Sequence, residues 1–127
     1  MMRILSTLLF LFVLTTKTAA QLMVNRVDVN SLDVQYCQLV CVHRTGMTKD
    51  KIDIYIDYGQ VNFQRSAYWE LRQIDSLGKY TERFGTIMQA VNYVAKNGWE
   101  VVSFQVMHDP GDSYKQFIYL MRKKQRQ

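Results

Sequence analysis

The chain has 127 residues, a formal net charge of +5, two cysteines and a single proline. Four of its basic residues, Arg122, Lys123, Lys124 and Arg126, stand in the last six positions, so the positive charge belongs to the end of the chain. A charge excess confined to one terminus does not indicate a nucleic-acid-binding surface, and we expect no nucleic acid among the partners.

The first 20 residues have the pattern of a secretory signal peptide. Arg3 supplies the positive start, Leu8–Leu14 is the apolar segment, and Thr18–Ala20 places small residues before Gln21. The apolar run is about half the length that spans a bilayer, so we expect cleavage and no stable membrane insertion. This interpretation places the protein in the periplasm or outside the cell. The remaining 107 residues suffice for one small domain with a single core.

After the signal peptide at 1–20, we expect a lead-in segment at 21–35, one domain at 36–122 and a basic tail at 123–127. The lead-in shows no sustained period and has room for a short edge strand at 23–29. The tail is typical of a solvated terminus, with a surface for anionic lipid or polysaccharide as the alternative.

Residues 86–107 predict one amphipathic helix, a glycine stop and a strand. Thr86 followed by Gln89 is a capping box, and a stripe of small and branched residues predicts the buried face of a helix over about 86–97. Gly98 suits the positive φ of a helix end, with Trp99 packing behind it. Residues 99–106 are rich in β-branched and aromatic side chains, which favour a strand.

The other predicted strands cover 36–43, 52–58 and 114–121, and 69–74 with 79–84 predict a hairpin around Asp75–Gly78. The alternation in 52–58 places Ile52, Ile54 and Ile56 on one face and Asp53, Tyr55 and Asp57 on the other. We therefore expect an α+β domain, with five or six short antiparallel strands and one long helix packed on one face. The second face would be polar and aromatic, and either solvated or an interface.

The two cysteines, Cys37 and Cys41, lie four residues apart in the first predicted strand. Their Cα atoms would be about 13 Å apart, roughly twice the reach of a disulfide, so we expect small buried side chains or free thiols. A metal site would need further soft ligands, and the chain offers only His43 and His108.

A family resemblance rests on Tyr36-Cys37, the Asp57–Gln60 strand end, the Asp75–Lys79 turn, Ala90–Tyr93 in the helix and Gly98-Trp99-Glu100. With these features the chain resembles small secreted proteins of unknown function from anaerobic Gram-negative gut-type bacteria, in which a helix ends in Gly-Trp-Glu. The resemblance implies the fold and an exported location. It implies no activity.

No local motif for catalysis, a cofactor or a metal stands in the sequence. We therefore expect a non-catalytic module that binds a protein, a glycan or a second copy of itself through the open sheet face. The candidate binding residues are Asp53, Tyr55, Asp57, Trp69 and Tyr119, because exposed aromatic side chains stack on sugars or anchor partners.

The alternative is a small carboxylate-dependent hydrolase acting on an extracellular polymer. It requires a cleft with two carboxylates about 5–10 Å apart. Asp53 and Asp57 lie about 13 Å apart on one strand, so a partner such as Glu70, Glu82 or Glu100 would be needed. The acids of a solvated sheet face explain the same residues, which makes the interaction module the preferred interpretation.

Overall fold

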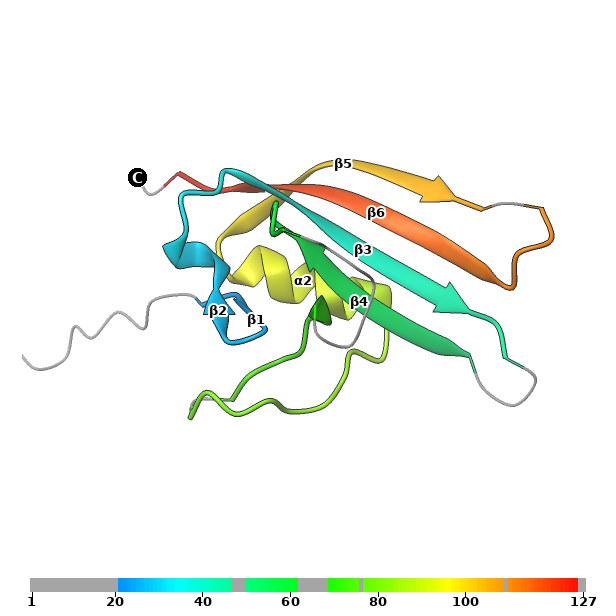
Figure 1. Ribbon diagram of the computed structural model, residues 1–127, viewed down its shortest axis with the longest axis horizontal. Coiled ribbons are helices and arrows are strands. Elements are labelled where there is room, and N and C mark those ends of the chain that lie inside the picture. Colours follow the sequence, from blue (N-terminus) through cyan, green and yellow to red (C-terminus); the bar gives the residue numbers. More distant parts are fainter. Residues whose placement is uncertain (1–20, 47–49, 62–68, 76, 109, 126–127) are drawn as a thin grey trace, which may run out of the picture.

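The computed structural model describes residues 21–46, 50–61, 69–75, 77–108 and 110–125, and the expected signal peptide lies outside these ranges. Within them the chain forms an α+β domain in which one α-helix packs against a four-stranded antiparallel sheet, with a two-stranded sheet beside it (Figure 1). The predicted fold class is therefore confirmed.

The main sheet has the strand order β4-β3-β6-β5, so the two strands joined by the helix stand at opposite edges. All neighbouring pairs are antiparallel, and β3 and β6 form the centre. The elements in chain order are β1 (Met23–Val24), β2 (Val27–Asp28), the 3-10 helix η2 (Val29–Ser31), β3 (Tyr36–Arg44), β4 (Lys51–Asp57), α2 (Ile87–Lys96), β5 (Trp99–Met107) and β6 (Tyr114–Lys123).

The helix α2 begins and ends at the predicted residues. The Thr86 hydroxyl accepts from the Gln89 backbone N–H at 3.1 Å, and the Gln89 side chain accepts from the Thr86 N–H at 3.3 Å, which completes the capping box. Gly98 follows the helix with a φ of +95°, a conformation that favours glycine. The buried stripe of Ala90, Val91 and Val94 faces the sheet.

The main core lies between α2 and one face of the sheet. Trp99 is fully buried there, as are Leu39, Ile56 and Met121 from three different strands. Both cysteines belong to the same core and are free, as expected.

The lead-in is part of the domain and not a segment outside it. Leu22, Val24 and Val29 are completely buried in the main core. The predicted edge strand at 23–29 is replaced by two-residue strands joined through Asn25 and Arg26, both at positive φ, followed by η2. Elements this short leave no sustained hydrophobic period, which is why the sequence pattern did not reveal them.

Two other segments differ from their predictions. The predicted turn has Gly78 at a φ of +75°, but within 69–75 and 77–84 the strands of the expected hairpin reduce to one bridge between Ile74 and Tyr80. Lys123 belongs to β6, and the Lys124 N–H donates to the Gly98 carbonyl oxygen at 2.9 Å. The first residues of the expected tail are therefore held against the domain.

Candidate interaction surface

The predicted binding residues of β4 lie on the face of the sheet that points away from α2. Tyr55 is paired with Val40 and Asp53 with Val42 in the adjacent strand. The expectation of an open face is wrong at this point, because Tyr55 is only 5% exposed and Asp53 only 4%. Asp57 is half-buried. The physical reason is a second apolar cluster on this face, made of Val40, Val42 and Tyr55 with Tyr114 and Ile118 against it.

Asp53 and Glu70 are both buried and are joined through one arginine. The Arg83 side chain lies 4.0 Å from an Asp53 oxygen and 3.2 Å from a Glu70 oxygen. Lys51 approaches Asp53 at 3.2 Å, and Arg72 approaches Glu70 at 2.9 Å. We call Asp53, Glu70 and these cations the ion-pair cluster.

The ion-pair cluster brings together two of the carboxylates that a hydrolase would require. Their oxygens, however, form ion pairs with cations of the same chain. The backbone beside Glu70 is also hydrogen-bonded to β4. Glu70 forms a bridge with Tyr55, and the Leu71 N–H donates to the Ile54 carbonyl oxygen at 2.8 Å. The arrangement therefore fastens residues 70–83 to the outer edge of β4, which is a structural task.

Trp69 and Tyr119, the remaining predicted binding residues, are partly buried and pack against the main core. The Tyr119 ring lies 5.0 Å from the Phe104 ring on the neighbouring strand. Neither side chain stands free on a flat face as an aromatic platform for a sugar would. The five predicted residues thus do not come together into one site.

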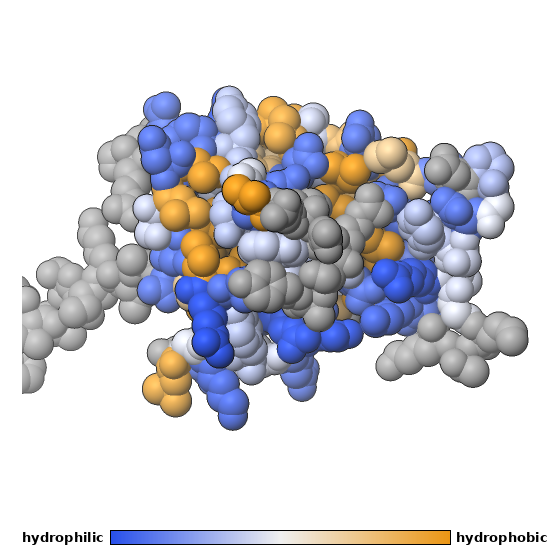
Figure 2. All heavy atoms as spheres, in the orientation of Figure 1, coloured by the Kyte–Doolittle hydropathy of each residue, from blue (hydrophilic) through white to orange (hydrophobic). Residues whose placement is uncertain are grey.

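The largest exposed apolar surface on the sheet belongs instead to β5. From Val101 to His108 every residue is exposed, although the segment is rich in apolar side chains. Figure 2 shows hydrophobic side chains along the edge of the molecule where Figure 1 places β5. We define the β5 rim as the large apolar side chains of this strand that are 45–53% exposed, namely Val101, Val102, Phe104, Val106 and Met107.

The β5 rim is exposed because of where the strand lies. Among the described residues it pairs with β6 alone, and the second half of the strand extends away from α2 (Figure 1). Val101, Phe104 and Val106 share the face that carries α2, since their partners in β6 pack against the main core. Beyond the part of β5 that α2 covers, no other described element lies over the row formed by Val101, Phe104 and Val106.

The backbone at the outer edge of β5 is open as well. No strand of the described ranges pairs with it, whereas the other edge of the sheet, at β4, is partly covered by Glu70 and Leu71. Natural edge strands are usually protected by lysine, proline or inward-pointing charge. Residues 101–107 contain none of these, and the one protective feature is a bulge at Val102.

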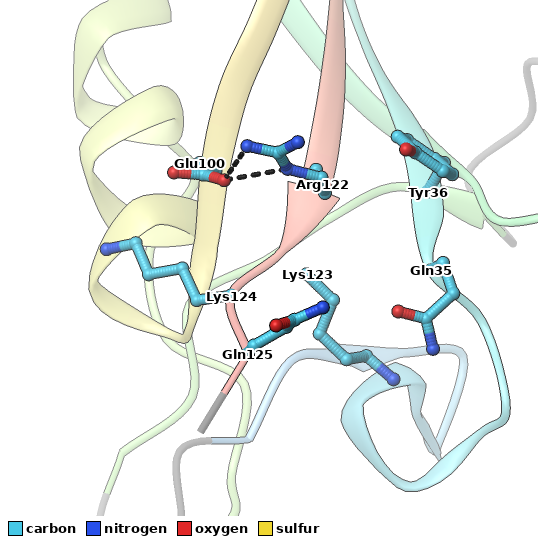
Figure 3. Close-up of a pocket in the computed structure, with 7 residues that line it drawn as sticks. All are labelled: Gln35, Tyr36, Glu100, Arg122, Lys123, Lys124 and Gln125. Atoms are coloured by element: carbon cyan, nitrogen blue, oxygen red, sulfur yellow. Dashed lines mark hydrogen bonds and ion pairs between the residues drawn. The ribbon is translucent and has the colours of Figure 1, made fainter. Parts of the chain in front are cut away.

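A hollow of about 620 Å³ lies at the other end of the sheet, where basic residues gather (Figure 3). Arg122 is turned toward Glu100, with an N–O distance of 2.6 Å, and this hydrogen bond raises the pKa of the guanidinium above its ordinary value. Lys123 donates to the Leu32 carbonyl oxygen at 2.8 Å, and Lys124 points the opposite way. The cations are engaged with protein atoms, so the hollow is a weak candidate for an anion site.

The two thiols are unsuited to nucleophilic chemistry. Burial raises the pKa of Cys41 from 9.0 to about 12, and burial together with the charge of Asp57 does the same for Cys37. Thiols with such pKa values carry almost no thiolate at neutral pH. Among the described residues, no three potential metal-binding side chains come together.

Sequence reasoning missed the β5 rim. The apolar content of 99–107 predicts a strand but does not predict whether its side chains are buried or exposed. Only the strand order reveals the exposure, because β5 returns from the helix to an edge and not to the centre of the sheet. The signal that the sequence does contain is the uncharged run Val101–Met107.

Within the described ranges, no helix has the length and apolar character needed to cross a membrane. Comparison of the chain with family models, curated proteins and solved structures finds no match.

Proposed function

We propose that this protein is a non-catalytic interaction module, exported from the cell, that holds a protein partner along β5. The observation that carries the proposal is the exposed, uncharged edge strand with the β5 rim on it. Contiguous exposed apolar surface of this kind marks interaction sites in soluble proteins. The sequence pattern of the first 20 residues supports the exported location.

The mode of binding that suits this surface is strand addition. An extended segment laid beside β5 would pair with its free backbone N–H and carbonyl groups, which supply affinity without regard to sequence. Phe104 and Val106, with Phe117 and Tyr119 behind them, would receive the side chains of the added segment on the α2 face. The site thus offers both a hydrogen-bonding edge and an apolar wall.

A glycan is a poorer match for the same protein. Sugar-binding surfaces present aromatic rings flat to solvent, with polar groups around them. Tyr55 is buried and Trp69 and Tyr119 are partly buried, while the β5 rim is aliphatic apart from Phe104. These observations favour a polypeptide partner over a carbohydrate.

The hydrolase remains the second interpretation, because Asp53 and Glu70 meet at Arg83. Neither carboxylate lines the hollow near Arg122. A pair of carboxylates that acts on a glycosidic bond needs room for the substrate between them, and here the shared space holds a guanidinium group. The ion-pair cluster is therefore better explained as a fastening between segments.

The proposal is tested by photo-crosslinking in cells that produce the full chain. Benzoylphenylalanine replaces Gln105 in β5 or, as the control, Asn92 on the exposed side of α2. We expect an adduct from position 105, none from position 92, and loss of the 105 adduct when Phe104→Lys is added. If position 105 yields no adduct, or if position 92 yields the same one, the proposal fails.

A further inference from the structure

We propose that the polypeptide held along β5 is the β5 of a second copy of this chain. The two strands pair antiparallel around a two-fold axis near Phe104, and the two four-stranded sheets become one continuous sheet of eight strands. This inference rests on the proposed function, and it adds the identity of the partner and the geometry of the interface.

The charge pattern of β5 suits pairing with itself. In a two-fold interface each residue of the strand meets a nearby residue of the same strand, so charged side chains along it would face like charges. Glu100 is the only charged residue between Trp99 and Met107, and it is already bound to Arg122 of its own chain. A second copy therefore meets no like-charge repulsion along the exposed run.

The side-chain pattern is self-complementary around Phe104. Phe104 is the middle residue of the uncharged run 101–107, so an axis there gives these residues the greatest overlap. Because the bulge at Val102 removes one position from the ladder, Val101 then lies opposite Val106 of the other copy, and Phe104 lies opposite its own counterpart. On the reverse face, Ser103 meets Gln105. Within 101–106, apolar residues therefore meet apolar ones and polar residues meet polar ones, while Met107 lies opposite Glu100 of the other copy.

The available area is sufficient for such a dimer. Each side chain of the β5 rim is about half exposed. A large aromatic residue presents about 150–250 Å² and valine and methionine less, so the five half-exposed residues offer at most about 300–500 Å² per copy and about 600–1,000 Å² for the pair. A specific interface needs about 1,000 Å² in total, and the strand backbone with Ser103 and Gln105 adds to the apolar contribution.

The first test is the mass of the protein in solution, measured by light scattering after expression of the full chain and purification. We expect twice the mass of a single chain for the wild type. Phe104→Lys should raise the dimer dissociation constant at least about 100-fold, because it removes the central apolar contact and places two ammonium groups opposite each other. Met88→Lys is the matched control, since Met88 is 55% exposed on α2, and it should leave the dimer intact.

The second test examines the predicted register. Phe104→Cys places one exposed thiol on the axis. At their closest, directly opposed residues have Cβ atoms about 4.5 Å apart, which is the upper limit for a disulfide, so mild oxidation should join the copies covalently. Met88→Cys provides an equally exposed thiol that should not join them. The native Cys37 and Cys41 are buried and do not interfere.

The outcomes separate this inference from the proposed function. A wild-type protein that is monomeric at about 100 μM, or a dimer that Phe104→Lys leaves intact, overturns the β5 dimer. If a monomer still gives a crosslinked adduct at position 105 with a mass other than that of two chains, the partner is a different protein. A monomer with no adduct at position 105 overturns both proposals.

Discussion

At the scale of single residues, Asn30 connects three parts of the molecule. Its side-chain carbonyl accepts from the Trp99 indole N–H at 2.7 Å, and its amide donates to the Asn97 carbonyl oxygen at 2.9 Å. We predict that Asn30→Ala lowers the free energy of unfolding by about 1–3 kcal/mol, because the buried indole N–H loses its acceptor. Denaturation by urea measures the change. Asn92→Ala, on the exposed side of α2, is the control and should stay within about 0.5 kcal/mol of the wild type.

Cys37 and Cys41 lead to a prediction about reactivity. Since both side chains are in the main core and their pKa is about 12, neither should react with iodoacetamide in the folded protein at neutral pH. Mass spectrometry should find no modified thiol in the native protein and two in guanidinium chloride. Rapid labelling of the native protein would show that the core opens at β3.

The same thiols predict how stability depends on alkaline pH. Their pKa is higher in the folded state than in the unfolded chain, so the unfolded state loses protons first as the pH rises above about 9. The stability they contribute is complete below that pH and declines toward pH 12, by at most about 1.4 kcal/mol per pH unit for each thiol. Urea denaturation between about pH 8 and pH 10.5 tests this, and a Cys37→Ala, Cys41→Ala variant should show a shallower decline.

At the scale of elements, the ion-pair cluster fastens residues 70–83 to β4. Asp53→Asn removes the carboxylate that pairs with Lys51 and Arg44, while Arg83 keeps its contact with Glu70. We predict a loss of about 2 kcal/mol in the free energy of unfolding. The value is below that of a fully buried pair because Lys51 and Arg44 are both about half exposed. Asp57→Asn is the control, since an asparagine oxygen still accepts from the Gly59 N–H.

The same variant separates the structural role of Asp53 from a catalytic one. If the carboxylate were catalytic, its replacement would abolish a hydrolytic activity without lowering stability, since catalytic groups are often held in strained or unfavourable surroundings. We expect the reverse, with lower stability in urea denaturation. An unchanged or raised stability would contradict the fastening role and return Asp53 to the list of candidate catalytic residues.

The elements that the sequence predicts well are those whose signals are local. Thr86, Gln89 and Gly98 mark the two ends of α2 through interactions with nearby backbone groups. The alternation of Ile52–Tyr58 marks a strand for a similar reason, since neighbouring side chains point to opposite faces. Such patterns identify an element without information about what lies beside it.

The features that the sequence does not predict depend on contacts between distant segments. Asp53 and Tyr55 read as a solvated face, yet Glu70 and Arg83 come from a segment with little regular structure and meet them there. The exposure of Phe104 depends on which strand lies beside β5, and the residues of β5 itself read equally well as a central strand. The β5 rim depends on such a contact between distant segments, so the strand order is needed to locate it.

At the scale of the whole molecule, the two edges of the sheet differ, because one is partly covered and the other is open within the described residues. Residues 70 and 71 cover part of β4, while the backbone of β5 has no partner among the described residues. A protein with one open edge can form a dimer and then stops, because pairing β5 with β5 uses the open edge of both copies. The asymmetry thus favours a closed pair over an extended fibre.

Pairing of β5 with β5 in a dimer predicts that the stability of the protein depends on its concentration. When two folded chains unfold to separate chains, each tenfold rise in concentration adds about 1.4 kcal/mol per dimer. For a pair of this size the melting temperature should then rise by about 2–4 °C per tenfold increase. Calorimetry over a hundredfold range of concentration measures it for the wild type, Phe104→Lys and Met88→Lys. If the melting temperature rises with concentration for the wild type and Met88→Lys but not for Phe104→Lys, the added stability comes from β5. A wild-type melting temperature that is independent of concentration would contradict the dimer.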